Sequence, residues 1–224
     1  IEPYHKEKLN AAYFQRIVDR LKEHSPDVIY MVSYLKDATL LVKKIRESNL
    51  NSLLCGGAGG FTSQKFIDSA GNDANHLLTA TLWTPFLNYP GTKEYYDKYI
   101  EKYSSPPDYH GVEAYSALLV VADVLKRADS FSPESIRVAL DNTHLMTPFA
   151  PVKFTSYENF ERQNSVPTQV LQIIDGKFEC IWPEDHASSS FIPPSYWRTS
   201  DKKNVSGSPS DVGRATSRYP FADG

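Results

Sequence analysis

The chain has few cysteines, no long apolar segment and no excess of positive charge. Its 224 residues include two cysteines, Cys55 and Cys180, and their number alone shows neither whether they pair nor which compartment the protein occupies. No apolar run approaches the ~18 residues that a membrane-spanning helix needs, so no direct membrane span is expected. The formal net charge of −3 argues against a nucleic-acid-binding protein, which usually carries a basic stripe.

Motifs for catalysis, nucleotide binding and metal binding are also missing. The glycine-rich stretch LLCGGAGGFTS, residues 53–63, has neither the Gly-Lys-Ser/Thr ending of a P-loop nor the GxGxxG spacing of a dinucleotide site. The chain has no GxSxG nucleophile elbow, and none of its six histidines has metal-ligand spacing. We therefore expect no catalytic residues, no metal and no cofactor. The chain opens at Ile1 without a visible leader, which we interpret as a mature chain or a fragment.

Hydrophobic periodicity in the first 82 residues alternates between helix and strand. Apolar spacings of three and four predict helices over residues 10–24 and within 33–50, and a third, short helix is predicted with Thr62 as its cap and Gly71 at its end. The apolar runs DVIYMV, SLLCG and HLLTATL predict buried strands. This alternation indicates a parallel sheet with right-handed crossovers and helices on both faces.

After Leu82 the pattern changes, and helices follow one another with little strand between them. The helix predicted over 111–128 is apolar on most sides, which indicates deep burial, and Ser132 is predicted to cap the helix after it. The predicted helices cover residues 93–103, 111–128 and 134–142.

Strand patterns return towards the C-terminus. A strand is predicted at 149–154, and residues 168–182 predict a hairpin in which Asp175 and Gly176 form the two-residue turn. The polar tail, residues 198–224, is expected to be disordered.

Two loops are candidates for ligand binding. Ser33 and Tyr34 follow the strand DVIYMV, and Gly57, Ala58 and Gly59 follow the strand SLLCG. The carboxyl ends of adjacent parallel strands lie at one edge of a sheet, where open α/β sheets bind ligands, so the loops should face one crevice.

Each candidate also has a plainer interpretation. The glycine loop could be a phosphate cradle or a simple strand-to-helix turn; we favour a backbone that lies close to a small polar ligand. Tyr34 could be a surface residue. Trp83, at the change of pattern, could contact ligand or only wedge two lobes together.

The order of several segments resembles the periplasmic solute-binding proteins of branched-chain amino-acid ABC importers, the Leu/Ile/Val-binding type I family. No single motif is diagnostic, but the order over residues 1–197 is specific. The matching segments are PDVIYMVSYLKDATLLVKKIRESNL, GGAGGF, LWTPF, PGTKEYYDKYIEKYSSPPD, VEAYSALLVVADVLKRA, SPESIRVAL, FAPVKF and TQVLQIIDGKFECIWPEDHA.

The resemblance implies an α/β fold of two lobes, with parallel sheets flanked by helices and a hinge between them. The family's N-terminal portion has no counterpart in this sequence, so we expect an incomplete first lobe and a fragment, a truncated gene product or a degenerate relative. The implied division is 1–82 and 168–197 for the second lobe, 83–90 for the crossing segment, 91–154 for the mostly helical returning part of the first lobe, 155–167 for a connecting loop and 198–224 for the tail.

The resemblance also implies a function. A small-molecule ligand, an amino acid or a related polar solute, would bind between the lobes without being altered and pass to the membrane permease of an ABC importer, in a periplasmic or extracellular location. A ligand-sensing receptor ectodomain on the same fold is the alternative, and a nucleotide-using enzyme is a weaker third hypothesis.

The resemblance also implies which loops of this sequence would contact the ligand. The loop of Ser33 and Tyr34 would place an aromatic ring over the ligand, and the loop from Gly57 to Gly59 would approach its amino group. Some family members have a Glu where this chain has Ala58, which leaves the amine partner open. Ala150 also replaces a common Gly.

The helix at 111–128 has a further consequence. In the resembled family it packs on the sheet of the first lobe, which this sequence has no segment to build. We therefore expect the isolated chain to be poorly stable, to self-associate and to bind no amino acid tightly.

Overall fold

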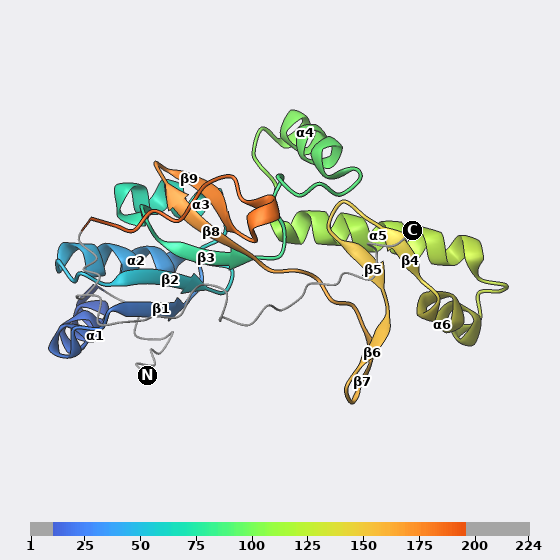
Figure 1. The fold of residues 1–224 in the computed structure, drawn as a ribbon, viewed down its shortest axis with the longest axis horizontal. Coiled ribbons are helices and arrows are strands. Elements are labelled where there is room, and N and C mark those ends of the chain that lie inside the picture. Colours follow the sequence, from blue (N-terminus) through green and yellow to red (C-terminus); the bar gives the residue numbers. More distant parts are fainter. Residues whose placement is uncertain (1–10, 196–224) are drawn as a thin grey trace.

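The computed structural model describes residues 11–195. Two bodies lie side by side along its longest axis (Figure 1). We call residues 11–81 with 169–195 the sheet body, and residues 92–163 the helical body. The predicted tail at 198–224 lies outside the described residues, as do residues 1–10 and 196–197.

The sheet body is built on one five-stranded sheet with the order β1-β2-β3-β8-β9. The first three strands are parallel, as the alternating pattern predicts, while β8 pairs antiparallel with β3 and β9 antiparallel with β8. Asp175 and Gly176 both have positive φ, at 49° and 75°, which suits a two-residue hairpin turn. The strands are β1 (Val28–Val32), β2 (Leu53–Gly57), β3 (Leu78–Thr81), β8 (Gln169–Ile174) and β9 (Lys177–Trp182).

Three helices cover one face of this sheet: α1 (Ala11–His24), α2 (Leu35–Glu47) and α3 (Gln64–Ala70). Their apolar faces form a single buried cluster with Ile29 and Met31 of β1. The short helix α3 begins one residue later than expected, with Ser63 rather than Thr62 at the N-cap position and no side-chain cap bond. Gly71 ends it, with a φ of 61°, as predicted.

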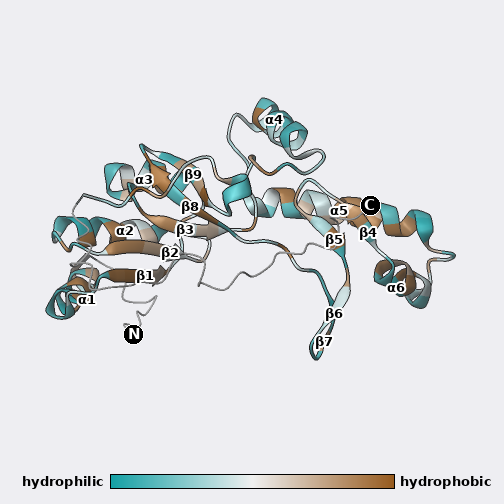
Figure 2. Ribbon diagram, in the orientation of Figure 1, coloured by the Kyte–Doolittle hydropathy of each residue, from teal (hydrophilic) through white to brown (hydrophobic). Residues whose placement is uncertain are grey.

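The opposite face of β1 is open, although helices were expected on both faces. Val28, Tyr30 and Val32 alternate with the buried residues and are 47%, 69% and 61% exposed. The hydropathy colouring shows the same apolar edge at β1 (Figure 2). A three-layer arrangement is therefore not present over β1 in the described residues.

The helical body consists of three helices and two small hairpins. Its helices are α4 (Thr92–Tyr103), α5 (Tyr109–Arg127) and α6 (Pro133–Asp141), and Ser132 caps α6 as predicted, with its Oγ accepting from Ser135 N–H at 3.2 Å. The strands β4 (His144–Met146) and β5 (Pro151–Lys153) pair with each other.

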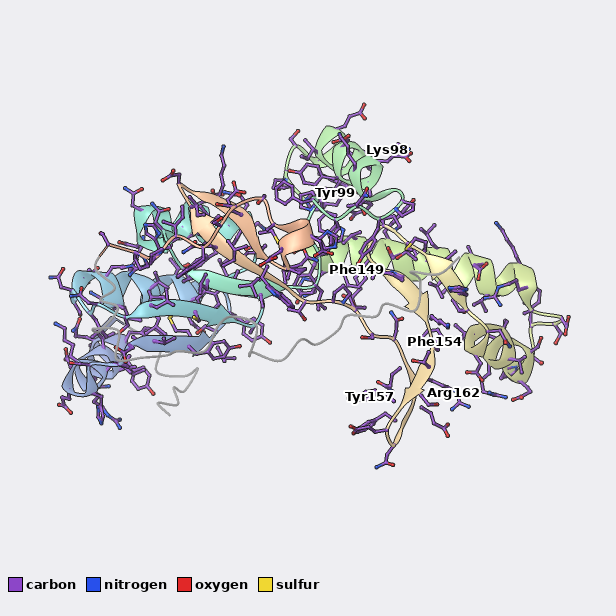
Figure 3. The ribbon with its side chains drawn as sticks, viewed as in Figure 1. Lys98, Tyr99, Phe149, Phe154, Tyr157 and Arg162 are labelled. Atoms are coloured by element: carbon purple, nitrogen blue, oxygen red, sulfur yellow. The ribbon has the colours of Figure 1, made fainter. Side chains whose placement is uncertain are left out.

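The segment expected to be a connecting loop contains a second hairpin. Strands β6 (Thr155–Tyr157) and β7 (Phe160–Gln163) project from the body, and all their residues are exposed (Figure 3). An ion pair of 2.9 Å between Arg162 and Asp141 ties the hairpin to α6. The hairpin is too short and too polar for hydrophobic alternation to signal it in the sequence.

Helix α5 is not deeply buried, contrary to the prediction from its composition. Only Val112, Ser116 and Val124 are buried, whereas Leu118 and Val121 are 68% and 50% exposed. One apolar face of α5 has no cover in the described part of the chain.

The four glycines at the end of β2 and in the turn after it differ in what a side chain at each would meet. A Cβ on Gly56 would lie 2.2 Å from the buried ring of Phe61, and a Cβ on Gly60 would lie 2.4 Å from the backbone oxygen of Ser33. At Gly57 the obstacle is the far end of the exposed Tyr30 side chain, and at Gly59 the nearest atom is 3.9 Å away. Two of the four glycines are therefore fixed by packing and two are not.

No helix in the range 11–195 combines the length and the apolar character needed to cross a membrane.

We expect alanine substitutions to separate the four glycines. Gly60→Ala and Gly56→Ala should lower the free energy of unfolding by about 1–3 kcal/mol because backbone or a packed ring must move. Gly59→Ala should be neutral or stabilise by up to about 1 kcal/mol, since alanine restricts the unfolded chain. Urea unfolding measures these differences, and equal losses at Gly59 and Gly60 would contradict the packing.

We also expect the two faces of α5 to respond differently. Leu118→Glu should change stability by no more than about 0.5 kcal/mol and reduce self-association, because the side chain is exposed. Val112→Ala, on the buried face, should cost about 1–3 kcal/mol. Light scattering and thermal unfolding test both variants. A large loss of stability in Leu118→Glu would show that this face is covered.

Candidate functional site

The two predicted loops lie against each other at the carboxyl ends of β1 and β2. Val32 stands opposite Gly57 in the parallel register. The N–H of Ser33 donates to the carbonyl of Gly57 at 3.4 Å, and the N–H of Gly60 donates back to the carbonyl of Ser33 at 3.2 Å. The predicted neighbourhood of these loops is therefore present, although their role in binding remains a prediction.

Ser33 and Tyr34 have opposite environments although they are adjacent. Ser33 is 2% exposed, and its Oγ has no hydrogen-bond partner among the described residues. Buried hydroxyls are normally paired, so this one has an unused capacity to bind a polar group. Tyr34 occupies the N-cap position of α2, and its side chain is 74% exposed. The Tyr34 ring is therefore accessible to a ligand, and little of its surface packs against the rest of the protein.

Ala58 is the residue of the glycine loop with an unusual backbone. Its φ of 65° lies in the left-handed region, which costs an L-residue with a Cβ on the order of 1 kcal/mol. The flanking Gly57 and Gly59 are not in that region. From Gly57 to Gly59 no side chain carries a carboxylate, so this loop offers a ligand only backbone groups and a methyl group.

Trp83 is buried at the junction of the two bodies and is 4% exposed. Its indole Nε1–H donates to the carbonyl of Pro148 at 2.9 Å, so this donor is not available to a ligand. Tyr95 packs against the Trp83 ring edge-on, with centroids 6.2 Å apart. Burial raises the pKa of the Tyr95 hydroxyl to about 12, with smaller repulsion from Tyr99 and Asp108.

The first residues of α5 reach the glycine loop from the other body. A Cβ on Gly59 would lie 3.9 Å from Cε1 of His110, and the His110 ring stacks on Tyr109 with centroids 3.9 Å apart. Asp108 caps the helix by accepting from Gly111 N–H at 3.1 Å, and its second oxygen lies 3.7 Å from His110 Nδ1.

Tyr109 and Tyr34 are close enough to interact electrostatically. Burial raises the pKa of the Tyr109 hydroxyl, and Glu113, Asp108 and Tyr34 raise it further. Sequence reasoning missed Tyr109 and His110 because only the fold brings them to a loop about 50 positions away. The capping pattern at Asp108 was the one local signal that a helix starts here.

A cavity of about 560 Å³ lies between the bodies at this junction. Of the six predicted site residues, Gly59 and Trp83 line it, together with Tyr109 and Tyr99. Ser33, Tyr34, Gly57 and Ala58 are not among its lining residues. The structure therefore brings the loop and the start of α5 together, but the cavity itself extends from them towards α4 and β9.

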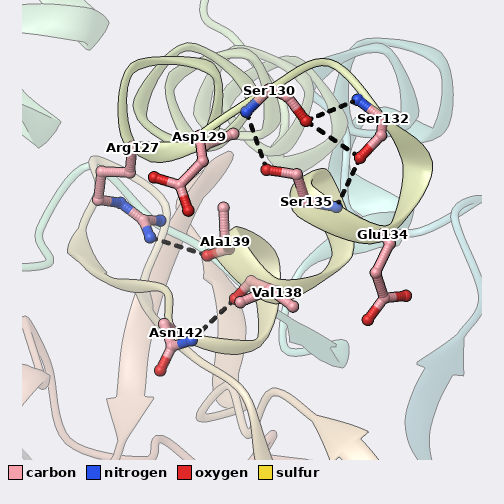
Figure 4. Close-up of a pocket in the computed structure, with 10 residues that line it drawn as sticks. Arg127, Asp129, Ser130, Ser132, Glu134, Ser135, Val138, Ala139 and Asn142 are labelled. Atoms are coloured by element: carbon pink, nitrogen blue, oxygen red, sulfur yellow. Dashed lines mark hydrogen bonds between the residues drawn. The ribbon is translucent and has the colours of Figure 1, made fainter.

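A second cavity of about 620 Å³ lies where α5 turns into α6 (Figure 4). Its polar groups bind one another: Ser135 Oγ accepts from the Ser130 N–H at 3.0 Å, and Arg127 donates to the carbonyl of Ala139 at 2.8 Å. These bonds hold the turn and the cap of α6. We assign this cavity a structural role.

Metal ligands do not gather anywhere in the described part of the chain: residues 11–195 contain no cluster of three or more His, Cys, Asp or Glu side chains that could hold an ion. Cys55 and Cys180 are free, and burial raises the pKa of both thiols.

Comparison with known proteins places these features in a family. The family model described as periplasmic binding protein matches residues 4–177. The Leu/Ile/Val-binding protein homolog 8 of Brucella melitensis is 26% identical over 188 residues, which are 80% of this chain and 46% of the relative. The leucine-, isoleucine-, valine-, threonine- and alanine-binding protein of Pseudomonas aeruginosa is 27% identical over 141 residues, covering 63% of this chain and 37% of that protein.

Solved structures show the same fold. A putative branched-chain amino acid ABC transporter protein of Silicibacter pomeroyi aligns with a TM-score of 0.66 at 20% identity, over 82% of this chain and 51% of its own. The substrate-binding protein LivJ of Streptococcus pneumoniae, in complex with isoleucine, aligns with a TM-score of 0.63 at 20% identity, over 81% and 49%. A solute-binding protein of R. palustris in complex with benzoate aligns with a TM-score of 0.63 at 17% identity, over 82% and 49%.

The chain spans about half the length of the curated relatives it matches. Its α/β architecture is that of the type I periplasmic binding proteins, with a mainly parallel central sheet and flanking helices. The matched residues make up well over half of the chain, and it belongs to the periplasmic binding protein family.

Proposed function

We propose that this chain provides one side of a ligand cleft in a non-catalytic solute-binding protein that delivers its ligand to the membrane permease of an ABC importer. The observation that carries the proposal is the meeting of two strand-end loops with the start of α5. Proteins of this family act in the periplasm or outside the cell. The ligand is an amino acid or a related small polar solute.

Each residue of the proposed site offers the ligand a different kind of contact. Tyr34 and Tyr109 provide aromatic surfaces from the two bodies, the loop from Gly57 to Gly59 provides backbone polar groups, and Ser33 provides an unpaired hydroxyl. Aromatic walls with a few polar groups are typical of small-molecule sites. Trp83 contributes ring surface only, because Pro148 already accepts its N–H.

The ligand's amino group has no charged partner in the loop from Gly57 to Gly59. Relatives are named for leucine, isoleucine and valine, while one structural neighbour holds benzoate, which has no amine. The loop at Ala58 supplies no carboxylate to pair with an ammonium group. An amino-acid ligand would therefore contact only the backbone of this loop.

The first test is a titration of the labelled chain followed by two-dimensional NMR, which detects weak binding. With L-leucine, L-isoleucine or benzoate as probe, we expect shifts at residues 33–34, 57–60 and 109–110. Tyr34→Ala should weaken binding at least about tenfold, equivalent to about 1.4 kcal/mol. Tyr157→Ala, at a tyrosine on the β6–β7 hairpin that is 66% exposed against 74% for Tyr34, is the matched control. Shifts confined to other regions would refute the site.

The second test places a carboxylate in the loop. Ala58→Glu should raise the affinity for L-leucine relative to benzoate by about tenfold, because a carboxylate favours an ammonium group and repels an anion. Ala58→Gln, of the same size but neutral, should leave the ratio unchanged. Calorimetry or NMR titration gives both ratios, and an unchanged ratio in Ala58→Glu would show that the ligand does not approach this loop.

A further inference from the structure

The cavity of about 560 Å³ between the bodies has a wall of aromatic rings, four of which the proposed cleft does not use. Its volume falls within the range of about 300–1,000 Å³ that is usual for small-molecule sites. Three segments supply these four rings: α4, β9 and residues 82–91, which join β3 to α4. The rings are those of Phe86, Tyr96, Tyr99 and Phe178.

Three of these rings are held in place by neighbouring side chains. Phe178 of β9 packs against the buried cluster of the sheet body, and Tyr96 of α4 packs against the buried cluster of the helical body. The Tyr99 ring contacts those of Tyr95 and Tyr103, with centroids 5.8 Å and 4.6 Å away. The wall is therefore largely preorganised, and its flat aromatic faces favour a ligand that is itself flat and apolar over much of its surface.

Four charged side chains also line the cavity, and they differ in whether they already have a partner. Both carboxylates are engaged, since Asp108 caps α5 and Glu179 accepts from the Ser188 hydroxyl. The ammonium groups of Lys65 and Lys177 make no ion pair or hydrogen bond within the described residues, and both side chains are exposed. The charges without a partner are therefore positive, and a charge-assisted hydrogen bond to an anionic ligand would satisfy them.

The cavity lies next to the proposed cleft but is lined mainly by different residues. Gly59 and Tyr109 border both, whereas Tyr34 is absent from the cavity wall. Neither lysine lies in the strand-end loops, because Lys65 belongs to α3 and Lys177 begins β9. A ligand in this cavity would therefore meet charged groups that the loops of the proposed cleft do not provide.

We propose that this cavity is a second binding site, which takes an aromatic carboxylate. The rings of Phe86, Tyr99 and Phe178 contact the ring system of the ligand, which stacks on them or meets them edge-on. The ammonium groups of Lys65 and Lys177 bind its carboxylate. The site is independent of the proposed function, since neither strand-end loop contributes a charged group to it and the ligand need not be transported.

The probe for this site is 2-naphthoate, and 2-naphthamide is its uncharged counterpart of nearly the same size. Each is titrated into the labelled chain and followed by two-dimensional NMR, at a protein concentration where light scattering shows a monomer. We expect shifts at residues 62–65, 86, 96–99 and 177–179. The acid should bind at least about tenfold more tightly than the amide, because only the acid pairs with the lysines. Equal affinities, or shifts absent from these residues, would overturn the proposal.

Substitutions separate the contribution of the charges from that of the rings. Lys65→Met combined with Lys177→Met should weaken 2-naphthoate at least about tenfold and leave 2-naphthamide unchanged, a difference that damage to the fold would not produce. Phe86→Leu, at a ring that is 51% exposed, should weaken both probes. Lys126→Met, at an exposed lysine of α5 outside the cavity, is the matched control and should bind both probes like the parent chain.

A double lysine variant that binds 2-naphthoate like the parent chain would overturn the second site, as would an equal loss in Lys126→Met. If the double variant does not fold, as judged by its thermal transition, the single lysine variants decide, each with an expected loss of about threefold. Tyr34→Ala should leave 2-naphthoate binding unchanged although it should weaken L-leucine binding in the cleft. Failure of the second site is therefore distinguishable from failure of the proposed function.

Discussion

The site depends on one close backbone contact, that between Gly60 and Ser33. The Gly60 N–H binds the Ser33 carbonyl at a point where a Cβ would lie 2.4 Å from the same oxygen. This contact joins the segments that follow two adjacent strands. It thereby positions the loop from Gly57 to Gly59. Gly56 and Gly60 are therefore explained by packing, whereas Gly57 and Gly59 are not. The absence of side chains at Gly57 and Gly59 leaves backbone groups accessible, and the proposed ligand contact relies on these groups.

Much of the sheet body could be predicted because its signals are local. Apolar periodicity located α1 and α2 to within a few residues, and Asp175-Gly176 located the turn between β8 and β9. The position of His110 beside Gly59 could not be predicted, since it depends on how two distant segments pack. Thr62 was expected to cap α3, but Ser63 takes that position, because either residue type suits a cap and only the backbone decides.

Apolar composition predicts burial at two elements that have an exposed face in the structure. Helix α5 and strand β1 both have the apolar content of buried elements, yet Leu118 and Tyr30 are 68% and 69% exposed. A pattern of apolar residues indicates the need for cover but not whether cover is present. Both faces belong to a chain that spans about half the length of the relatives it matches.

The bonded position of Trp83 gives the chain an internal spectroscopic reporter. Its indole is almost fully shielded from solvent at the junction, whereas Trp182, on the edge strand β9, is 53% exposed. The emission of a tryptophan shifts to longer wavelength when water reaches the ring, so these two residues should contribute separate blue and red components. In a Trp197→Phe background, which leaves Trp83 and Trp182 as the two tryptophans, a quencher dissolved in the solvent would reach Trp182 first, and the shielded component would then report on the joint between the two bodies.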